Sequence, residues 1–523
     1  MVKVKMIEKD RRRLVFLNLG AGMGASIINL VMSFASRSIF IYFLGSVYLG
    51  LNGLFTSLLT VLSLAELGIG NSIVYFLYKP LAEKKWSTVY GLLKLYKRIY
   101  RYIGVAVFVI GMILMIFIPS FVHDEIEVNK LHVLFLLFLL NSVVSYFFTY
   151  NRSILIADQK SYFVVAVDSF MKVVVQIAQI AFLFLFKSFE IYLLLQVIAT
   201  LVGNVWISRV AFKRYPEAFK GGGEASTQLL HQLRRNVVGN FANKFGDVVV
   251  NGMDNILISM FVSVTAVGLY SNYWMIVSAL QSFLLSISSS VTATIGNIAV
   301  TDKDNTEGMK AFRTHQFFNF SLSYFSGVMM YAMIGPFISI WLGKSYLLGN
   351  ALIGVLTLMY FVNRMRNTGN VFLDAYGLAW EQRAKPFIEA IINLTLSIVF
   401  LKFLKLGIVG VVLSTLITSF GFATFFEANI VFKNALRLPI SKFMGPYFKY
   451  VGAFVLSLIV VDRLLQFLPK PIGVLWFTLR LLVSMLITVI MYVIMFHKYS
   501  EYSIVRSLIM GRILTKIRKE RNG

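Results

Sequence analysis

Apolar segments long enough to cross a bilayer recur along the chain, and short polar turns separate them. Of the 523 residues, 58% are hydrophobic and 14% are charged, which is less charge than a soluble protein of this size carries. The pattern therefore predicts an all-α, polytopic membrane protein with about 14 transmembrane helices. The predicted helices cover residues 14–44, 47–78, 98–118, 131–156, 162–186, 190–212, 236–262, 266–298, 315–341, 350–377, 386–404, 407–432, 447–467 and 474–497.

Lysine and arginine are concentrated on one side of the predicted helices. If the N-terminus lies in the cytoplasm, most basic residues fall in inward-facing segments, and the outward-facing loops are short and hold few of them. This asymmetry predicts a multi-pass protein with both termini in the cytoplasm. It also explains the net charge of +26 by contacts of basic loops with anionic membrane lipids, so no nucleic-acid partner is predicted.

An internal repeat divides the chain into two halves. Residues 43–51 resemble residues 261–269 in one turn, and residues 157–163 resemble residues 380–387 in another. The repeat predicts two pseudo-symmetric six-helix lobes with two further helices, and transporters of this design bind their substrate between the lobes. The predicted parts are an N-terminal lobe at 1–212, a cytoplasmic linker at 213–235, a C-terminal lobe at 236–432, two extra helices at 433–497 and a basic cytoplasmic tail at 498–523.

The predicted helix at 236–262 carries a stripe of polar and ionisable side chains. Successive members are three or four residues apart, which places all of them on one helix face. Ionisable groups inside a membrane are unfavourable by roughly 2.5–3.5 kcal/mol each, and they usually face a bundle interior or a watery cavity. We therefore expect this helix to line a polar path. The stripe consists of Asn240, Lys244, Asp247, Asn251 and Asp254.

Two cations in the first half stand out because they lie within apolar helices. Arg37 has no acidic residue within one turn, so it either extends to the membrane interface or binds an anion. Lys172 follows Asp168 by four residues, and this spacing fits a local ion pair as well as a ligand site.

The predicted helix at 350–377 also has a polar face. Its members are Asn363, Arg366, Asn367, Asn370 and Asp374. One interpretation is a hydrogen-bonded seam between helices. We favour a cavity wall, because an arginine on such a face needs water or an anion. Arg364 lies about 200° around the helix from Arg366, so only one of them can face the cavity, and Arg366 is the stronger candidate.

Cations from both halves predict a central cavity that attracts a phosphate-bearing substrate, since guanidinium and ammonium groups suit phosphate oxygens. The carboxylates would neutralise the empty cavity or bind a coupling ion, Na⁺ or H⁺, and no other cofactor is predicted. The chain has no cysteine, no metal-ligand pattern among its histidines and no nucleophile arrangement, so no metal site and no catalytic residue is predicted. The predicted substrate-binding residues are Arg37, Lys172, Lys244, Arg366, Asn240, Asn251 and Asn370, and the ion-coupling candidates are Asp247, Asp254 and Asp374.

Four segments carry recognisable motifs. They are AELGIGNSI at 65–73, VGLYSNY at 267–273, DAYGLAW at 374–380 and FIEAIINL at 387–394. These segments, in this order, resemble the polysaccharide-export (Wzx-type) flippases of the multidrug/oligosaccharidyl-lipid/polysaccharide exporter (MOP) superfamily. The resemblance spans nearly the whole chain.

The resemblance implies a transporter of the bacterial plasma membrane and not an enzyme. Its substrate would be an oligosaccharide repeat unit on undecaprenyl pyrophosphate, moved from the inner to the outer leaflet for capsule or other surface polysaccharide. The polymerase of the same pathway is then an expected partner. A cation-coupled multidrug antiporter and a lipid II-type precursor flippase are alternatives with the same fold. A polymerase or ligase is disfavoured, because the outward loops are too short to hold catalytic groups.

Overall fold

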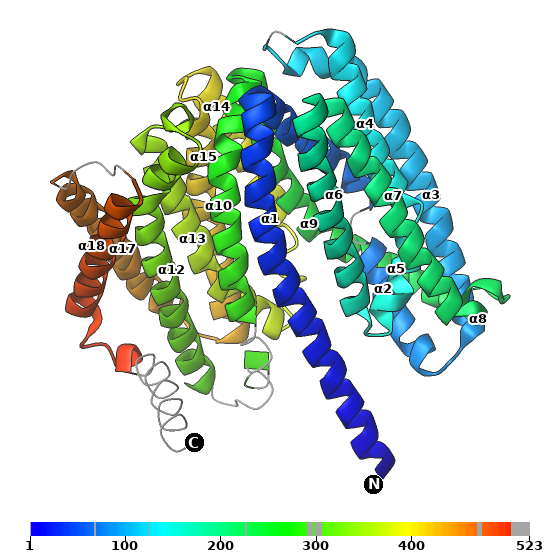
Figure 1. Ribbon diagram of the computed structural model, residues 1–523. Coiled ribbons are helices and arrows are strands. Elements are labelled where there is room, and N and C mark those ends of the chain that lie inside the picture. The colour runs from blue at the N-terminus through cyan, green and yellow to red at the C-terminus, as the bar shows by residue number, and fades with distance from the viewer. Residues whose placement is uncertain are drawn as a thin grey trace, which may run out of the picture. The chain divides into compact units, whose positions relative to one another are not determined.

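The computed structural model describes residues 2–66, 69–124, 126–224, 227–289, 295–296, 298, 306–467 and 473–503, with some side chains left out, chiefly in 2–27 and 228–251. These ranges consist of helices joined by turns and contain no β-strand (Figure 1). Helices satisfy every backbone donor and acceptor within one segment, as a lipid environment requires. The predicted all-α, polytopic fold class is confirmed.

The chain forms two compact units, unit 1 (Met1–Ser271) and unit 2 (Asn272–Gly523). Helix α9 packs on α1 and α2 and so belongs to unit 1, whereas the sequence repeat assigns it to the second half. The lobe boundaries therefore stay a prediction. The elements of unit 1 are α1 (Val2–Leu62), η1 (Ser63–Glu66), α2 (Ile69–Ala82), α3 (Trp86–Phe117), η2 (Ile118–Phe121), α4 (Val128–Tyr146), α5 (Thr149–Ala157), α6 (Ser161–Phe186), α7 (Phe189–Arg214), α8 (Pro216–Lys220), α9 (Thr227–Phe261) and the start of α10 (Val264–Ser289).

Unit 2 continues from α10 and includes a helix in which the backbone pattern changes twice. Between residues 408 and 435, two π-helical segments, η4 and η5, flank the short helix α16. The elements of unit 2 after α10 are α12 (Thr306–Trp341), η3 (Lys344–Tyr346), α13 (Asn350–Ala375), α14 (Lys385–Lys402), α15 (Ile408–Ile417), η4 (Thr418–Ala423), α16 (Thr424–Ile430), η5 (Val431–Ala435), α17 (Ser441–Gln466) and α18 (Gly473–Phe496).

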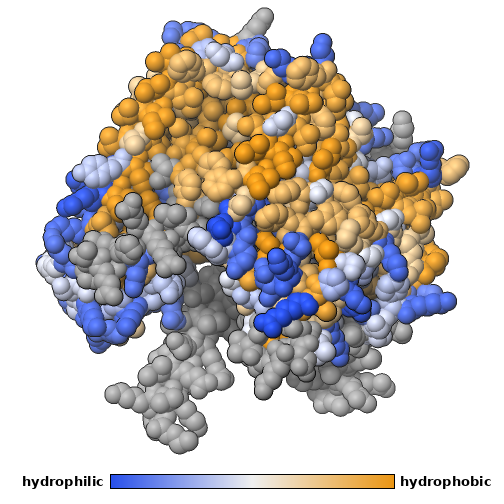
Figure 2. All heavy atoms as spheres, turned by 180° about the vertical axis from the view of Figure 1, so that it is seen from behind, coloured by the Kyte–Doolittle hydropathy of each residue, from blue (hydrophilic) through white to orange (hydrophobic). Residues whose placement is uncertain are grey.

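Eight helical stretches of the described residues are long and apolar enough to cross a membrane. Many of their large apolar side chains are exposed, and Figure 2 shows such side chains over much of the visible surface, with hydrophilic ones gathered towards one end. A soluble protein does not expose so much contiguous apolar surface. The chain is therefore a multi-pass membrane protein. The eight stretches are Ile28–Leu62, Trp86–Phe121, Val128–Tyr146, Ser161–Phe186, Phe189–Arg214, Thr306–Trp341, Ile408–Ala435 and Gly473–Phe496.

Two turns that the sequence repeat pairs lie against each other within unit 1. Gly45, with φ 79° and ψ −176°, bends α1 between the first two predicted spans. A methyl group on Gly50 would overlap the carbonyl oxygen of Val264, and one on Gly268 would overlap the carbonyl oxygen of Ser46. Gly50 and Gly268 occupy matching positions of the repeat, so each turn uses its glycine to bring its backbone against the other turn.

The last two helices, α17 and α18, are integrated into the core of unit 2. They pack on α12 through stacked and edge-on aromatic rings. Tyr324 of α12 hydrogen-bonds Ser457 of α17 at 2.6 Å, and Ser321 of α12 hydrogen-bonds Tyr492 of α18 at 2.5 Å. Their in-span charges also contact α12, since the Tyr331 hydroxyl donates to Asp462 at 2.9 Å.

One glycine of the predicted linker packs closely on helix α3. Gly223 has φ 147°, and a methyl group there would lie 2.6 Å from the carbonyl oxygen of Ser87 at the start of α3. In the structure this part of the predicted linker therefore packs on α3.

We expect Gly223→Ala to lower the free energy of unfolding by about 1–3 kcal/mol, because the new side chain meets both an unfavourable φ and a backbone atom. The thermal midpoint of the purified protein measures the effect. Gly222→Ala is the matched control, since a methyl group there meets no atom within 4 Å. Equal midpoints for the two variants would contradict the docking of the linker on α3.

Candidate functional site

Arg37 lies on α1 where that helix meets α7 and α10. Its Nη1 donates to the Ser271 hydroxyl of α10 at 3.2 Å, and it also lies close enough to Tyr192 of α7 for an electrostatic interaction. The side chain is half-buried. This arginine therefore points into a junction of three helices in unit 1 and contacts hydroxyl groups there.

The polar face of α6 contains an ion pair with a partner that the sequence did not reveal. Asp168 accepts two hydrogen bonds from Arg152 of α5, at 2.7 and 2.9 Å, and Arg152 Nε also donates to Asn204 of α7 at 3.0 Å. The alternative in which Lys172 pairs with Asp168 is therefore wrong. Lys172 is exposed on this membrane-spanning helix, and no described residue forms an ion pair with it.

Only one member of the α9 stripe has a described side chain. The side chains of Asn240, Lys244, Asp247 and Asn251 lie outside the described residues. Asp254 is 9% exposed, and its Oδ1 has no hydrogen-bond partner among the residues that the structure describes. A buried carboxyl in this situation is unfavourable when ionised, so it favours binding a proton or a cation.

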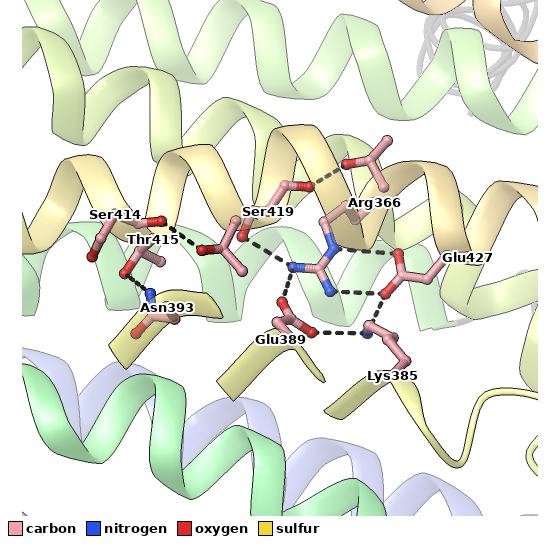
Figure 3. Close-up of polar contacts among 10 residues, drawn as sticks. Arg366, Lys385, Glu389, Asn393, Ser414, Thr415, Ser419 and Glu427 are labelled. Carbon is pink, nitrogen blue, oxygen red and sulfur yellow. Dashed lines mark hydrogen bonds and ion pairs between the residues drawn. The ribbon is translucent and has the colours of Figure 1, made fainter. Parts of the chain in front are cut away.

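Arg366 of α13 lies in a ring of alternating charges inside unit 2 (Figure 3). Its Nη2 and Nε contact Glu427 of α16 at 2.8 and 3.2 Å, and its Nη1 contacts Glu389 of α14 at 3.0 Å. Lys385, at the start of α14, closes the ring by contacting both Glu389, at 3.4 Å, and Glu427. We call these four residues the charge ring.

The charge ring changes the interpretation of Arg366. The sequence predicted an arginine on a cavity wall that needs water or an anion; in the structure two carboxylates compensate its charge. The side chains are nearly inaccessible, with 12% exposure at Arg366 and 1% at Glu427. Charges this deeply buried are stable only when opposite charges and hydrogen bonds surround them. In this conformation Arg366 holds α13, α14 and α16 together.

Towards the C-terminal end of α13, two side chains of the polar face are exposed. Asn370 and Asp374, one and two turns after Arg366, are both exposed. Arg364 is 2% exposed and donates to Asn319 of α12 at 3.2 Å. The two arginines thus contact different helices, as their angular separation predicted.

The same arrangement of charges occurs in both units. In unit 1, Arg152 precedes the turn that leads to α6 and bonds Asp168 on that helix; in unit 2, Arg366 precedes the turn that leads to α14 and bonds Glu389. A polar side chain on the following helix completes each cluster. Sequence reasoning missed Arg152 because it considered one helix at a time.

Among the described residues, no group of three or more His, Asp or Glu side chains could hold a metal ion.

The sequence profile of the family described as "Polysaccharide biosynthesis protein" matches residues 17–293, which is more than half of the chain. The chain belongs to this family. The matched residues include the candidate cations Arg37 and Lys172 and the buried carboxyl of Asp254. These side chains therefore lie in the part of the chain that matches the family. No curated protein matches the chain in sequence.

Solved structures of a lipid flippase and of multidrug transporters have the same fold. The structure described as lipid II flippase MurJ in an inward closed conformation is 16% identical, with a TM-score of 0.64, and the alignment covers 92% of this chain and 99% of that one. An inward-facing multidrug resistance MATE family transporter of the MOP superfamily gives 13% identity, a TM-score of 0.63 and coverage of 81% and 98%. The eukaryotic MATE transporter AtDTX14 is 13% identical, with a TM-score of 0.52, and the alignment covers 82% of this chain and 96% of that one. The fold that the motifs implied, which is that of a MOP-superfamily transporter, is confirmed.

Proposed function

We propose that this protein is a flippase that moves undecaprenyl-pyrophosphate-linked oligosaccharide repeat units from the inner to the outer leaflet of the bacterial plasma membrane. The product serves assembly of capsule or another surface polysaccharide, and transport proceeds by alternating access, with no covalent chemistry. Membership of the polysaccharide biosynthesis family and the MOP fold support this proposal. The observation that carries it is Lys172, an exposed ammonium group on a membrane-spanning helix with no ion-pair partner among the described residues.

A diphosphate headgroup is the ligand that such cations suit. Ammonium and guanidinium groups form short, charge-assisted hydrogen bonds to phosphate oxygens, and these bonds are stronger where water is scarce. The proposed substrate-binding set is Arg37, Lys172, Lys244, Arg366, Asn240, Asn251 and Asn370. Within this set, Arg37 and Lys172 would bind the headgroup in the described conformation. Arg366 would bind it only after its contacts with Glu427 change. The lipid-linked oligosaccharide, membrane lipids and the polymerase of the pathway are the proposed partners.

Coupling to an ion gradient is proposed to use the carboxylates Asp247, Asp254 and Asp374. Burial of Asp254 supports its place in this set, because protonation or cation binding would relieve the unfavourable burial of its charge. Asp374 is exposed near the end of α13 and is therefore accessible to ions.

We expect Arg37→Ala and Lys172→Ala each to abolish surface polysaccharide while the protein stays in the membrane. Each substitution removes a cation that holds the headgroup, and the structure pairs Asp168, the carboxylate one turn before Lys172, with Arg152 instead. Surface polymer is measured by immunoblotting, and membrane fractions give the amount of protein. Lys187→Ala is the control, since Lys187 is an exposed lysine just after the same helix α6. Normal polymer from both variants would contradict the proposal.

A multidrug antiporter with this fold is the second candidate, and the buried Asp254 favours it, since a carboxylate can bind a cationic drug and a coupling ion in turn. Uptake of a fluorescent drug cation into inverted vesicles that depends on Asp254 would support it. A lipid II-type precursor flippase differs from the leading proposal only in the sugar, and analysis of the lipid-linked glycan separates the two.

A further inference from the structure

Arg366 binds Glu427 in the geometry that it would use for a phosphate group. Two nitrogens of the guanidinium, Nη2 and Nε, contact the two carboxylate oxygens side by side, at 2.8 and 3.2 Å. Parallel contacts of this kind are how arginine recognises carboxylate and phosphate alike. Glu427 therefore occupies a place on Arg366 that fits an anionic oxygen pair.

The helix that carries Glu427 has a backbone suited to rearrangement. The π-helical segments η4 and η5 lie directly before and after α16, the turn that contains Glu427. The Thr424 hydroxyl donates to the carbonyl oxygen of Ser419 at 2.7 Å, which is a contact across the first π segment. Each π turn accommodates one residue more than an α turn, and such segments occur often at functional sites.

A change of either π segment to α-helix would turn Glu427 away from Arg366. Each residue corresponds to about 100° of helix rotation, so removing one extra residue moves the side chain to another face. Ser419, which accepts a hydrogen bond from Arg366 Nη1 at 3.1 Å, lies in the first π segment and would move as well. Arg366 would then lose two of its three partners at once.

We propose that Glu427 is an internal competitor for the substrate headgroup: it covers Arg366 in the described conformation and yields it to a diphosphate when η4 and η5 change register. This inference rests on the proposed function. With all four members ionised, the charge ring is neutral; without Glu427 it holds two cations and one carboxylate, and the excess positive charge attracts an anion. The exchange thus links the presence of a headgroup to the shape of the helix between residues 408 and 435.

The test measures binding of inorganic pyrophosphate to the full chain in phosphatidylcholine nanodiscs by isothermal titration calorimetry. Glu427→Gln keeps the shape of the side chain and removes its charge, so we expect the dissociation constant to fall about tenfold, the effect of one charge-assisted hydrogen bond. Adding Arg366→Gln to this variant should remove the gain. Asp462→Asn is the control: this carboxylate of unit 2 contacts Tyr331 and Gln466, outside the charge ring, and its loss should leave the dissociation constant unchanged.

The outcomes separate this inference from the proposed function. No gain in pyrophosphate affinity on Glu427→Gln, with polymer export still dependent on Arg37 and Lys172, would overturn the exchange alone. A gain that requires Arg366, with export independent of Arg37 and Lys172, would support the exchange and contradict the flippase. If Glu427→Gln does not fold, Glu427→Asp carries the same expectation, because the shorter side chain covers Arg366 less well. Failure of both variants to fold would identify the charge ring as a fixed structural element and overturn the proposal.

Discussion

Replacing Gly268 or Gly50 by alanine is expected to destabilise the protein by about 3 kcal/mol or more and to abolish polysaccharide export. At each position the added methyl group would overlap a backbone carbonyl oxygen of the facing turn, Ser46 for Gly268 and Val264 for Gly50. A backbone atom cannot adopt another rotamer, so the turns must separate, and overpacking of this kind typically costs about 1–3 kcal/mol, occasionally more. Thermal unfolding in nanodiscs measures the stability, and surface polymer measures export.

Gly452→Ala provides the matched control for these variants. Gly452 lies inside α17, and a methyl group there meets no atom within 4 Å. Alanine has a higher helix propensity than glycine by about 1 kcal/mol, so this variant should be as stable as the unchanged protein or more stable. If Gly268→Ala were as stable as Gly452→Ala, the close contact between the two turns would be refuted.

Arg366→Ala is expected to lower the free energy of unfolding by about 3–5 kcal/mol, because it leaves two buried carboxylates with only Lys385 as a counter-charge. This is a larger loss of stability than Arg37→Ala should produce, since the Ser271 hydroxyl that Arg37 contacts is neutral and is not left as an uncompensated buried charge. Chemical denaturation in mild detergent, followed by tryptophan fluorescence, measures both variants.

A paired replacement tests whether the charge of Glu427 causes this loss. In Arg366→Met with Glu427→Leu, apolar side chains of similar size replace the ion pair, and Lys385 still contacts Glu389. Such replacements of buried pairs are often neutral or stabilising. We expect the double variant to be more stable than Arg366→Ala. A double variant at least as unstable as Arg366→Ala would show that packing, and not uncompensated charge, governs this region.

Long apolar runs predicted the helices well where the backbone is regular. The expected spans at 162–186 and 190–212 correspond to α6 and α7, because the boundary turn contains polar residues and the runs have the length of a bilayer. The breaks inside other spans were not predictable in this way. The span at 131–156 divides into α4 and α5, and the span at 407–432 contains the π segment η4 and ends inside the second, η5. Hydropathy measures the free energy of transfer to lipid. It does not indicate which carbonyl oxygen each amide N–H hydrogen-bonds, and that choice distinguishes a π turn from an α turn.

The site residues were predictable only as far as one helix determines them. Spacing along α13 correctly separated Arg364 from Arg366, because both lie on the same helix. Spacing failed for Asp168, whose partner Arg152 lies on α5, and for Arg366, whose partners lie on α14 and α16. The order of charges in the two halves contained a signal, since an arginine before the turn and a carboxylate after it occur in each. This signal becomes readable once the clusters are seen in both units.

We propose above all that this protein transfers a lipid-linked oligosaccharide between leaflets. The most direct measurement is deletion of its gene, followed by isolation of undecaprenyl-pyrophosphate-linked glycans and labelling of intact cells with a reagent that does not cross the membrane. The account predicts that the complete repeat unit accumulates and is protected from the reagent, because it stays in the inner leaflet. Accumulation of a complete repeat unit that the reagent labels in intact deletion cells would contradict the account.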